Sequence, residues 1–506
     1  MARLDVDLLV VGGGIHGAGI ARDAAGRGLT VLLAEQGDLA GATSSASSKL
    51  AHGGLRYLEL GDFRLVREAL RERETLMRIA PHLVWPMPFF LPRAPATRPA
   101  WQIRAGLLLY DWLAGASGLP RSRALDLSGV SEGEFLRPQC RRGFCYYDGW
   151  ADDARLVVAN AMDAAMRGAI VMTRTRCVAV APRGAAWSVQ LAAADTPKVE
   201  VGARAIVNAT GPWVERFLRE CTPVQAAVAA RLVKGSHLVV PRRLAGGRAL
   251  LLPNDDGRVV FVVPFEGEFA LIGTTDVPLS GDPGAVAISQ AEVEYLCRAV
   301  NRYLVQPVSE RDIAWTFSGV RALHDDGTEN PSRVTRDYLL QLDHAENRAP
   351  ILSVYGGKLT TYRRLAEEAL GKLSRTFPAL RPAWTSRAQL PGGDLGGMSP
   401  QRFAEALRTR YPGLPAQWVA GIASRHGALA DAVINRACSA QELGVHFGAG
   451  LTAREIEYLV QREWALEADD VLWRRTKAGL HLDGEQRRAV ARHLLGLTAP
   501  GRGELG

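Results

Sequence analysis

Three glycines near the N-terminus have the spacing of a phosphate-binding turn. Gly12, Gly14 and Gly17 form a Gly-x-Gly-x-x-Gly pattern that follows the apolar run Asp7–Val11 and precedes a stretch of small residues. Glycines at these places let a backbone approach a pyrophosphate closely, while the start of a helix supplies N–H donors and a positive partial charge. The pattern therefore predicts a dinucleotide site. The competing interpretation is a glycine-rich turn without a ligand.

An acidic residue supports the dinucleotide interpretation. Glu35 follows Gly17 by 18 residues, at the end of the next predicted strand. A carboxylate there accepts hydrogen bonds from the hydroxyls of an adenosine ribose and disfavours a 2′-phosphate. The pattern alone does not separate FAD from NAD, because both present the same pyrophosphate.

A hydroxyl-rich segment lies just beyond this unit. Thr43–Lys49 carries five hydroxyl side chains and is followed by His52–Tyr57, which contains two glycines. Hydroxyl and backbone N–H groups in such a turn suit a second phosphate or a flavin ring. The alternative is an ordinary polar loop.

The elements that must hold these residues can be predicted from periodicity. A strand at Asp7–Val11, a helix at Ala18–Gly28 and a strand at Leu29–Glu35 form a βαβ unit. Arg64–Ile79 has the pattern of an amphipathic helix that ends at Pro81. Further strands and helices are predicted at Ala205–Ala209, His237–Pro241, Val259–Pro264, Ala270–Thr274, Ala453–Trp464 and Asp469–Lys477, the last two in a helical region that begins near Pro400.

Composition limits the class of protein. A chain of 506 residues suggests two to four domains. Six cysteines without a CxxC pair indicate reduced thiols and no metal site, and we expect a cytoplasmic protein without a targeting peptide or a membrane span. The net charge of +8 favours phosphorylated substrates or acidic lipid surfaces, although solvated surface charge explains it equally well. No nucleic-acid module is visible.

Motifs along the whole chain resemble one family. The segments Lys234–His237, Ile272–Asp276, Ser318–Arg321, Gly356–Tyr362 and Asp469–Lys477, together with the N-terminal motifs, are similar to the aerobic, FAD-dependent glycerol-3-phosphate dehydrogenases. The resemblance implies an α/β plus α fold: a glutathione-reductase-type FAD-binding domain, an inserted β-rich substrate domain and a helical C-terminal domain. The implied boundaries are 1–75, 150–225 and 335–385 for the FAD domain, 76–149 and 226–334 for the substrate domain, and 395–506 for the C-terminal domain.

The resemblance also implies the cofactor site. Ala209–Gly211 matches the second glycine turn of the FAD domain, and Gly356–Thr361 matches the segment beside the flavin pyrimidine. Lys358 or the local amides would stabilise negative charge there. The residues expected to contact FAD are Gly12, Gly14, Gly17, Glu35, Thr43, Ser45, Ser48, Gly53, Ala209, Gly211, Gly357, Leu359 and Thr360.

The implied reaction is oxidation of sn-glycerol 3-phosphate to dihydroxyacetone phosphate by hydride transfer from C2 to FAD. Catalytic roles fall to His237, Arg321 and Lys358, with His237 as the base because an imidazole titrates near neutral pH. His52 and an arginine with a shifted pKa are competitors for that role. The phosphate clamp is expected to comprise Arg56, Tyr57, Arg321, Arg336 and Lys358.

By the same resemblance, electrons pass to ubiquinone at the inner face of the cytoplasmic membrane without the chain spanning it. The basic balance and apolar patches such as Trp101–Trp112 fit a peripheral attachment. These residues could equally be core, and a homodimer is the oligomer considered. His16 departs from the family's usual asparagine; covalent flavin attachment through it is disfavoured by its distance from the ring. The alternatives are a glycerol-3-phosphate oxidase that reduces dioxygen, an amine or amino-acid oxidase, and a non-catalytic FAD-binding scaffold.

Overall fold

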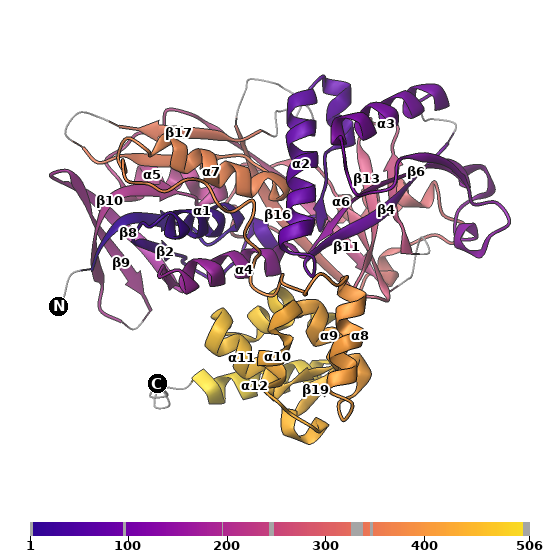
Figure 1. The fold of residues 1–506 in the computed structure, drawn as a ribbon. Helices are drawn as coiled ribbons and strands as arrows, with labels where there is room; N and C mark the ends of the chain where they lie inside the picture. Colours follow the sequence, from indigo (N-terminus) through magenta and orange to yellow (C-terminus); the bar gives the residue numbers. More distant parts are fainter. Residues whose placement is uncertain are drawn as a thin grey trace.

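The computed structural model describes residues 4–94, 98–194, 196–241, 247–324, 337–344 and 348–498. Two large sheets and a separate group of helices make up the fold (Figure 1). The first sheet has the order β17-β18-β10-β1-β2-β7, and β9 extends it by pairing with β10 and β8. Its strands are β1 (Leu4–Val11), β2 (Val31–Ala34), β7 (Ile170–Met172), β8 (Thr175–Arg183), β9 (Ala186–Ala193), β10 (Val199–Asn208), β17 (Leu339–Asp343) and β18 (Ile351–Tyr355).

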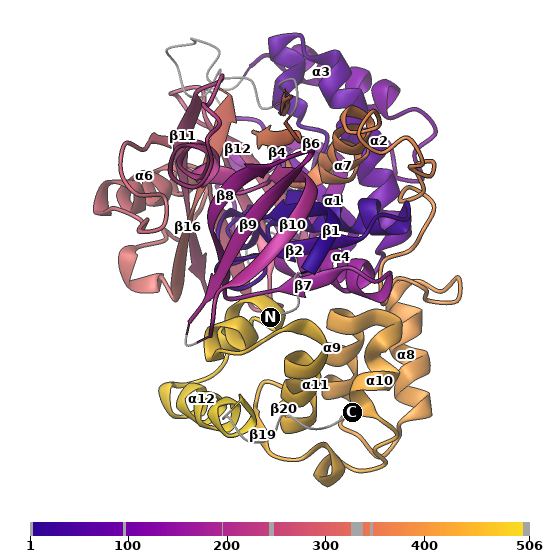
Figure 2. The same ribbon diagram turned by 90° about the vertical axis from the view of Figure 1, so that its left-hand side faces the viewer.

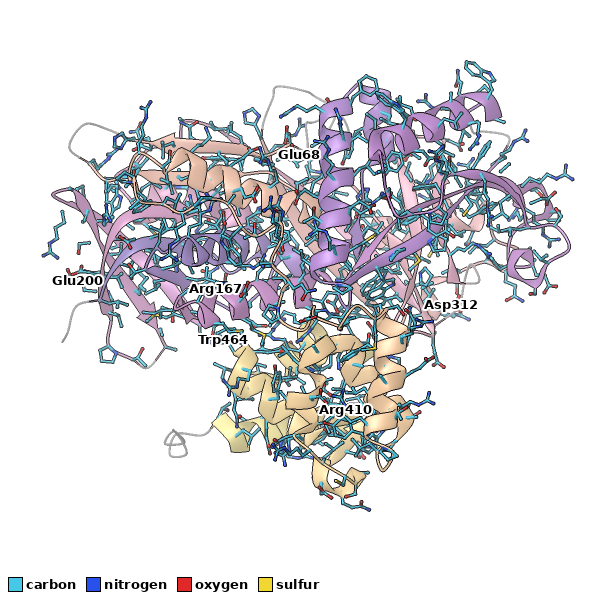
Figure 3. All side chains as sticks on the ribbon, viewed as in Figure 1. Glu68, Arg167, Glu200, Asp312, Arg410 and Trp464 are labelled. Carbon is cyan, nitrogen blue, oxygen red and sulfur yellow. The ribbon has the colours of Figure 1, made fainter. Side chains whose placement is uncertain are left out.

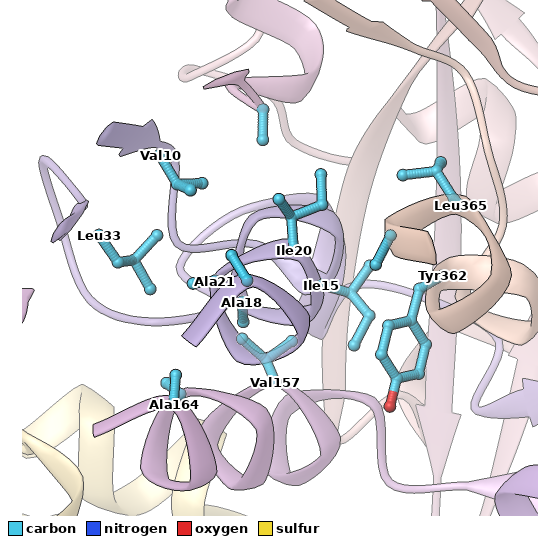
Figure 4. Packing of buried hydrophobic residues seen from close by; sticks show 14 of the residues in the cluster. Val10, Ile15, Ala18, Ile20, Ala21, Leu33, Val157, Ala164, Tyr362 and Leu365 are labelled. Carbon is cyan, nitrogen blue, oxygen red and sulfur yellow. The ribbon is translucent and has the colours of Figure 1, made fainter. Parts of the chain in front are cut away.

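The centre of the first sheet is parallel and buried. Strand β1 pairs in parallel with both β2 and β10, and β10 pairs in parallel with β18. Helix α1 (Ile15–Gly26) lies between α4 (Asp153–Met166) and α7 (Tyr362–Lys372), where Ala18 and Ala21 allow close packing (Figure 4). The small side chains of Ala18 and Ala21 thus let α1 pack closely against its neighbouring helices.

The second sheet has the order β15-β11-β14-β13-β12-β4-β6-β3, with β16 beside β11 and β5 beside β6. It is mostly antiparallel, and α6 packs on β11 and β13. Helices α2 and α3 pack against each other at its other side (Figure 1). The elements are β3 (Leu50–Ala51), β4 (Val84–Pro92), β5 (Arg123–Asp126), β6 (Arg142–Ala151), β11 (Ala230–Val240), β12 (Ala249–Pro253), β13 (Val259–Phe265), β14 (Phe269–Gly273), β15 (Val277–Pro278), β16 (Trp315–His324), α2 (Phe63–Ile79), α3 (Ala100–Ala114) and α6 (Gln290–Asn301).

The C-terminal helices form a body of their own below both sheets in two perpendicular views (Figures 1 and 2). Trp464 lies at its boundary with the first sheet's helices and packs against their core (Figure 3). A short helix, α5 (Val214–Cys221), belongs instead to the first sheet. The C-terminal elements are α8 (Pro400–Arg410), α9 (Ala416–His426), α10 (Ala430–Ile434), β19 (His446–Gly448), β20 (Leu451–Thr452), α11 (Ala453–Glu463), a π-helical turn at Asp470–Arg475 and α12 (Gly484–Thr498).

Buried ion pairs join the C-terminal body to the first sheet. Arg475 is fully buried and donates to both oxygens of Asp38, at 2.6 and 2.8 Å. Lys477 reaches both oxygens of Asp152 at 2.5 Å. Because a buried charge without its partner is costly, these pairs fix how the two bodies meet.

We expect Arg475→Ala to lower the free energy of unfolding by about 3 kcal/mol, at the lower end of the range for a broken buried ion pair, because Arg474 still reaches Asp38 at 2.5 Å. The midpoint of urea unfolding measures this. Arg410→Ala is the matched control: its pair with Asp431 is exposed and should be worth less than about 1 kcal/mol. Equal midpoints for the two variants would contradict the role given to Arg475.

Most predicted elements exist, with shifted ends. The first helix begins at Ile15 instead of Ala18, because its N-terminus takes over directly from the glycine turn. The predicted helix Asp469–Lys477 is only a π-helical turn. Trp101–Trp112 lies within α3, where Trp101 is 69% and Trp112 75% exposed, so these two rings are not core. In the described part of the chain, no helix is long and apolar enough to cross a bilayer.

Candidate active site

One cavity of about 1570 Å³ runs between the two sheets and reaches the C-terminal body at Arg474. It exceeds the roughly 300–1,000 Å³ typical of small-molecule sites, so it can hold a large cofactor and a substrate together. Most of the residues predicted for the site line it: Gly12, Gly14, Glu35, Thr43, Ser48, Arg56, Tyr57, Ala209, Gly211, His237, Arg321, Gly357, Lys358, Leu359 and Thr360.

In the glycine turn, the backbone at Gly12 and Gly17 lies so close to its neighbours that a side chain at either position would clash. Gly12 has φ +111°, and a Cβ there would lie 2.4 Å from the carbonyl oxygen of Ala209. At Gly17 a Cβ would lie 1.8 Å from the carbonyl oxygen of Gly12. Gly12 therefore lets two loops meet, and Gly17 lets α1 approach the turn.

Glu35 lines the cavity beside the glycine turn. Its carboxylate accepts hydrogen bonds from the N–H of Gly13 at 2.6 Å and of Gly37 at 2.7 Å. Burial raises the pKa of the Glu35 carboxyl, and the two N–H donors offset part of that rise. The bonds fix its orientation, and each carboxylate oxygen keeps lone pairs for ribose hydroxyls.

The hydroxyl-rich segment is tied to both sheets. Ser47 and Lys49 both bond Asp153 at the start of α4, with Lys49 Nζ 2.8 Å from each carboxylate oxygen. Thr43 donates to the carbonyl of Val320 in β16 at 2.6 Å. Between these anchors, the Ser48 hydroxyl lies 2.9 Å from His237 Nε2. The segment thereby joins the predicted cofactor site to the predicted base.

His237 lies on β11 and is 2% exposed. Its ring stacks on Phe317 at 4.8 Å, and its Nδ1 atom is buried without a hydrogen-bond partner among the described residues. Burial, reinforced by the positive charges of Lys49 and Arg321, lowers the pKa of His237 well below 6.5. The expectation that this imidazole titrates near neutral pH is therefore wrong, and the ring is neutral at physiological pH.

Arg321 reaches the cavity from β16 and is 22% exposed. It forms an ion pair with Asp276 and lies 3.3 Å from the Thr274 hydroxyl. Gly235 makes room for it, because a Cβ there would lie 2.3 Å from the guanidinium. Asp276, for which the motifs predict no role, also lines the cavity and must share Arg321 with any phosphate.

Lys358 lines the cavity, with Nζ 3.8 Å from the centre of the Tyr57 ring. The neighbouring Gly357 approaches His16 so closely that a Cβ would lie 2.6 Å from the imidazole. Burial lowers the pKa of His16 to about 4, against a smaller opposing effect of the Lys358 backbone. The His16 imidazole is therefore neutral at physiological pH.

Four predicted residues are placed differently or not described. Gly17, Ser45 and Gly53 do not line the cavity. Gly53 instead packs where a Cβ would lie 2.5 Å from the Tyr110 hydroxyl, and the Ser45 hydroxyl bonds the carbonyl of Ala42 at 3.2 Å. Arg336 lies outside the described residues.

The site combines a parallel strand, a glycine turn and a helix with an acidic residue at the end of the next strand. This unit opens into a cavity with cationic side chains. Together these features define a dinucleotide-dependent oxidoreductase. Residues 7–363 match the model of the FAD dependent oxidoreductase family, and residues 383–501 match that of the C-terminal domain of alpha-glycerophosphate oxidase. The chain belongs to the FAD-dependent oxidoreductase family.

Named relatives cover nearly the whole chain. It is 48% identical to the aerobic glycerol-3-phosphate dehydrogenase of Escherichia coli, over 97% of this chain and 98% of that protein. It is 49% identical to the D-erythritol 1-phosphate dehydrogenase of Brucella abortus, over 96% of each. The glycerol-3-phosphate dehydrogenase of Bacillus halodurans, solved with FAD, has a TM-score of 0.75 at 25% identity, covering 97% of this chain and 94% of that one.

The cofactor is FAD, and the residues present fit it. The cavity is lined by Glu35, by Gly12 and Gly14 of the glycine turn, and by Lys358. At Gly211, with φ +57°, the place of a Cβ has no heavy atom within 4 Å, so this backbone is open to a ligand. The predicted FAD-binding fold with a helical C-terminal domain is confirmed by the family match and by the Bacillus structure.

Proposed function

We propose that the protein oxidises sn-glycerol 3-phosphate to dihydroxyacetone phosphate. The observation that carries this proposal is a single cavity in which the FAD-binding segments meet the cations Arg56, Arg321 and Lys358 and the neutral imidazole of His237. A phosphate dianion suits several cations better than the single carboxylate of an amino acid does. This favours a phosphorylated alcohol over the substrate of an amine or amino-acid oxidase, and a catalytic protein over a scaffold.

In this proposal each side chain has a defined task. Arg321, Arg56 and Lys358 bind the phosphate, Tyr57 adds a hydroxyl and Arg336 remains a predicted contact. Neutral His237 accepts the proton of the C2 hydroxyl, with its ring held by Ser48 and Phe317. FAD supplies the hydride acceptor. Burial of His237 excludes water that would compete for the proton.

A second substrate has equal support from sequence similarity, because the Brucella relative acts on D-erythritol 1-phosphate. This polyol phosphate offers the same phosphate and secondary alcohol with one carbon more. The test is kcat/KM for both compounds on the same FAD-loaded enzyme. The proposal requires the larger value for glycerol 3-phosphate, and a larger value for D-erythritol 1-phosphate would replace it. If neither compound bleaches the flavin under anaerobic conditions, a non-catalytic FAD-binding scaffold is favoured instead.

We propose that the electron acceptor is ubiquinone, taken up at the inner face of the cytoplasmic membrane. The proposed oligomer is a homodimer. Support comes from α3, where Trp101, Leu108 and Trp112 are exposed, and from Arg98 just before the helix, which also pairs with Glu59. Exposed tryptophans beside a cation suit a lipid interface. Stoichiometric peroxide without a quinone would instead establish the oxidase. Cosedimentation with anionic vesicles tests the attachment, and light scattering tests the dimer.

The lowered pKa of His237 has a kinetic consequence. A base with a lowered pKa keeps its proton-accepting form as pH falls and loses it only well below 6.5. We therefore expect kcat at saturating substrate to stay level from about pH 8 to about pH 6.5, and the acid limb to begin below that. His237→Gln should lower kcat by about 10²- to 10⁴-fold at every pH. A wild-type inflection centred near pH 6.5 would contradict this assignment.

A further inference from the structure

Four aromatic rings form a continuous stack from the C-terminal body to His237. Trp473 stacks on Trp315 at 4.7 Å and 20°. Trp315 contacts Phe317 at 4.8 Å with a tilt of 45°, and Phe317 stacks on His237 at 4.8 Å and 19°. The only ring in this stack from the C-terminal body is Trp473, more than 230 residues after His237 in the sequence.

The register of the second sheet explains the first three rings. Strands β11 and β16 are antiparallel, and His237 lies directly opposite Phe317. Trp315 is two residues before Phe317, so both side chains project from the same face of β16. The rings therefore stand side by side along one face, and His237 is the inner member of the row.

The fourth ring is held by the π-helical turn at Asp470–Arg475. Arg474 and Arg475 bind Asp38, and Asp470 pairs with Arg174 at 2.7 Å. Gly479 leaves space for the indole, since a Cβ there would lie 2.8 Å from the Trp473 ring. These anchors place Trp473 firmly against Trp315.

The same short segment also supports His237 from its other side. Lys477 binds Asp152, and the adjacent Asp153 binds Ser47 and Lys49. Ser48, between those two residues, contacts His237 Nε2. Residues 473–477 thus support both the ring that stacks on His237 and the loop that contacts its nitrogen.

The charged groups that face His237 are Lys49 from the hydroxyl segment and Arg321 from β16, with Asp153 paired to Lys49 and Asp276 paired to Arg321. Both cations disfavour a protonated imidazole, as burial does. The burial of His237 depends on its neighbour Phe317 staying in place. Phe317 is itself held between His237 and Trp315. Removing the outer ring would let water approach through the stack.

We propose that Trp473 is a positioning residue for the reaction. Acting through Trp315 and Phe317, it holds the His237 ring against Ser48 and keeps water from the inner face of that ring. The C-terminal body is in this way part of the active site and not only a stabilising appendage. The proposal rests on the proposed function of His237 as the base.

The test compares Trp473→Ala with Trp473→Phe and with a matched control. Trp418→Ala removes another partly buried tryptophan of the C-terminal body, one that stacks on His446 at 4.2 Å and packs against a different apolar cluster from Trp473. In FAD-loaded enzyme we measure the rate of flavin reduction across pH and the melting temperature. Modification of His237 by diethyl pyrocarbonate is followed by peptide mass spectrometry.

For Trp473→Ala we expect flavin reduction to slow roughly tenfold, an acid limb moved to higher pH, and faster modification of His237. Trp473→Phe should restore most of the rate, and Trp418→Ala should match wild type in rate and modification. If Trp473→Ala lowers only the melting temperature, the proposal is overturned. Should that variant not fold, Trp315→Leu interrupts the same stack and is judged by the same outcomes.

Failure of the proposed function is distinguishable from failure of this inference. If wild-type flavin is bleached by neither polyol phosphate, the assigned reaction is wrong. The diethyl pyrocarbonate measurement does not depend on turnover, so it still shows whether Trp473 shields His237. Unchanged modification in Trp473→Ala would remove that shielding whatever the substrate is.

Discussion

Gly12→Val should yield a protein that purifies without FAD. The Cβ of valine would lie 2.4 Å from the Ala209 carbonyl oxygen, at a backbone φ of +111° that a β-branched residue does not tolerate. The turn can relieve the clash only by moving away from Ala209, which would separate the two loops that we propose border the pyrophosphate. Flavin absorbance per protein after gel filtration, and added FAD titrated by fluorescence, measure the loss.

A second glycine serves as the control. Gly168 also has a positive φ, +92°, but a Cβ there has no heavy atom within 4 Å. Gly168→Ala therefore carries the backbone strain without the clash and should keep its FAD. Normal flavin content in Gly12→Val would show that this turn does not border the cofactor.

Arg321→Ala should reduce kcat/KM for glycerol 3-phosphate by about 10²-fold or more, on the order of 3 kcal/mol. Of the two cations that lower the pKa of His237, Lys49 has the larger effect and the Arg321 guanidinium the smaller. Arg321 also lines the cavity, where a phosphate can reach it. Its removal also leaves Asp276 as a carboxylate without this partner, which repels the phosphate further. Steady-state kinetics on FAD-loaded protein measure the effect.

Two variants separate a specific contact from general charge. Arg321→Lys keeps the charge but loses the planar fork and should recover only part of the activity. Arg216→Ala removes a cavity-lining arginine that is paired with Glu220 at 2.9 Å and half exposed, and it should change kcat/KM little. If Arg216→Ala were as damaging as Arg321→Ala, the clamp would have to be reassigned.

The sequence predicts best what depends on neighbouring residues. Gly12, Gly14 and Glu35 belong to one βαβ unit of about 30 residues, so their spacing already implies a pyrophosphate on a helix N-terminus. The shifted start of α1, at Ile15, shows the usual limit: periodicity places an element but not its first turn.

The rest depends on contacts between distant segments. Ser48 and His237 are 189 residues apart, and nothing in either motif predicts their hydrogen bond. The role of Asp276 appears only once β16 places Arg321 beside it, and the lowered pKa of His237 requires burial that one sequence position cannot reveal. Trp473 was part of a recognised motif, yet its stack on Trp315 exists only across the boundary of two bodies.

The wide spread of the cavity lining along the chain has a consequence for biosynthesis. Its residues begin at Val11 and end at Arg474, so a ribosome must finish almost the entire chain before the complete cavity exists. At about 5–20 residues per second this takes roughly half a minute to a minute and a half. During the first part of that interval the nascent glycine turn lacks Ala209, against whose carbonyl Gly12 packs. The complete cavity therefore exists only after the π-helical turn has been synthesised, well beyond residue 363, where the match to the FAD dependent oxidoreductase family ends.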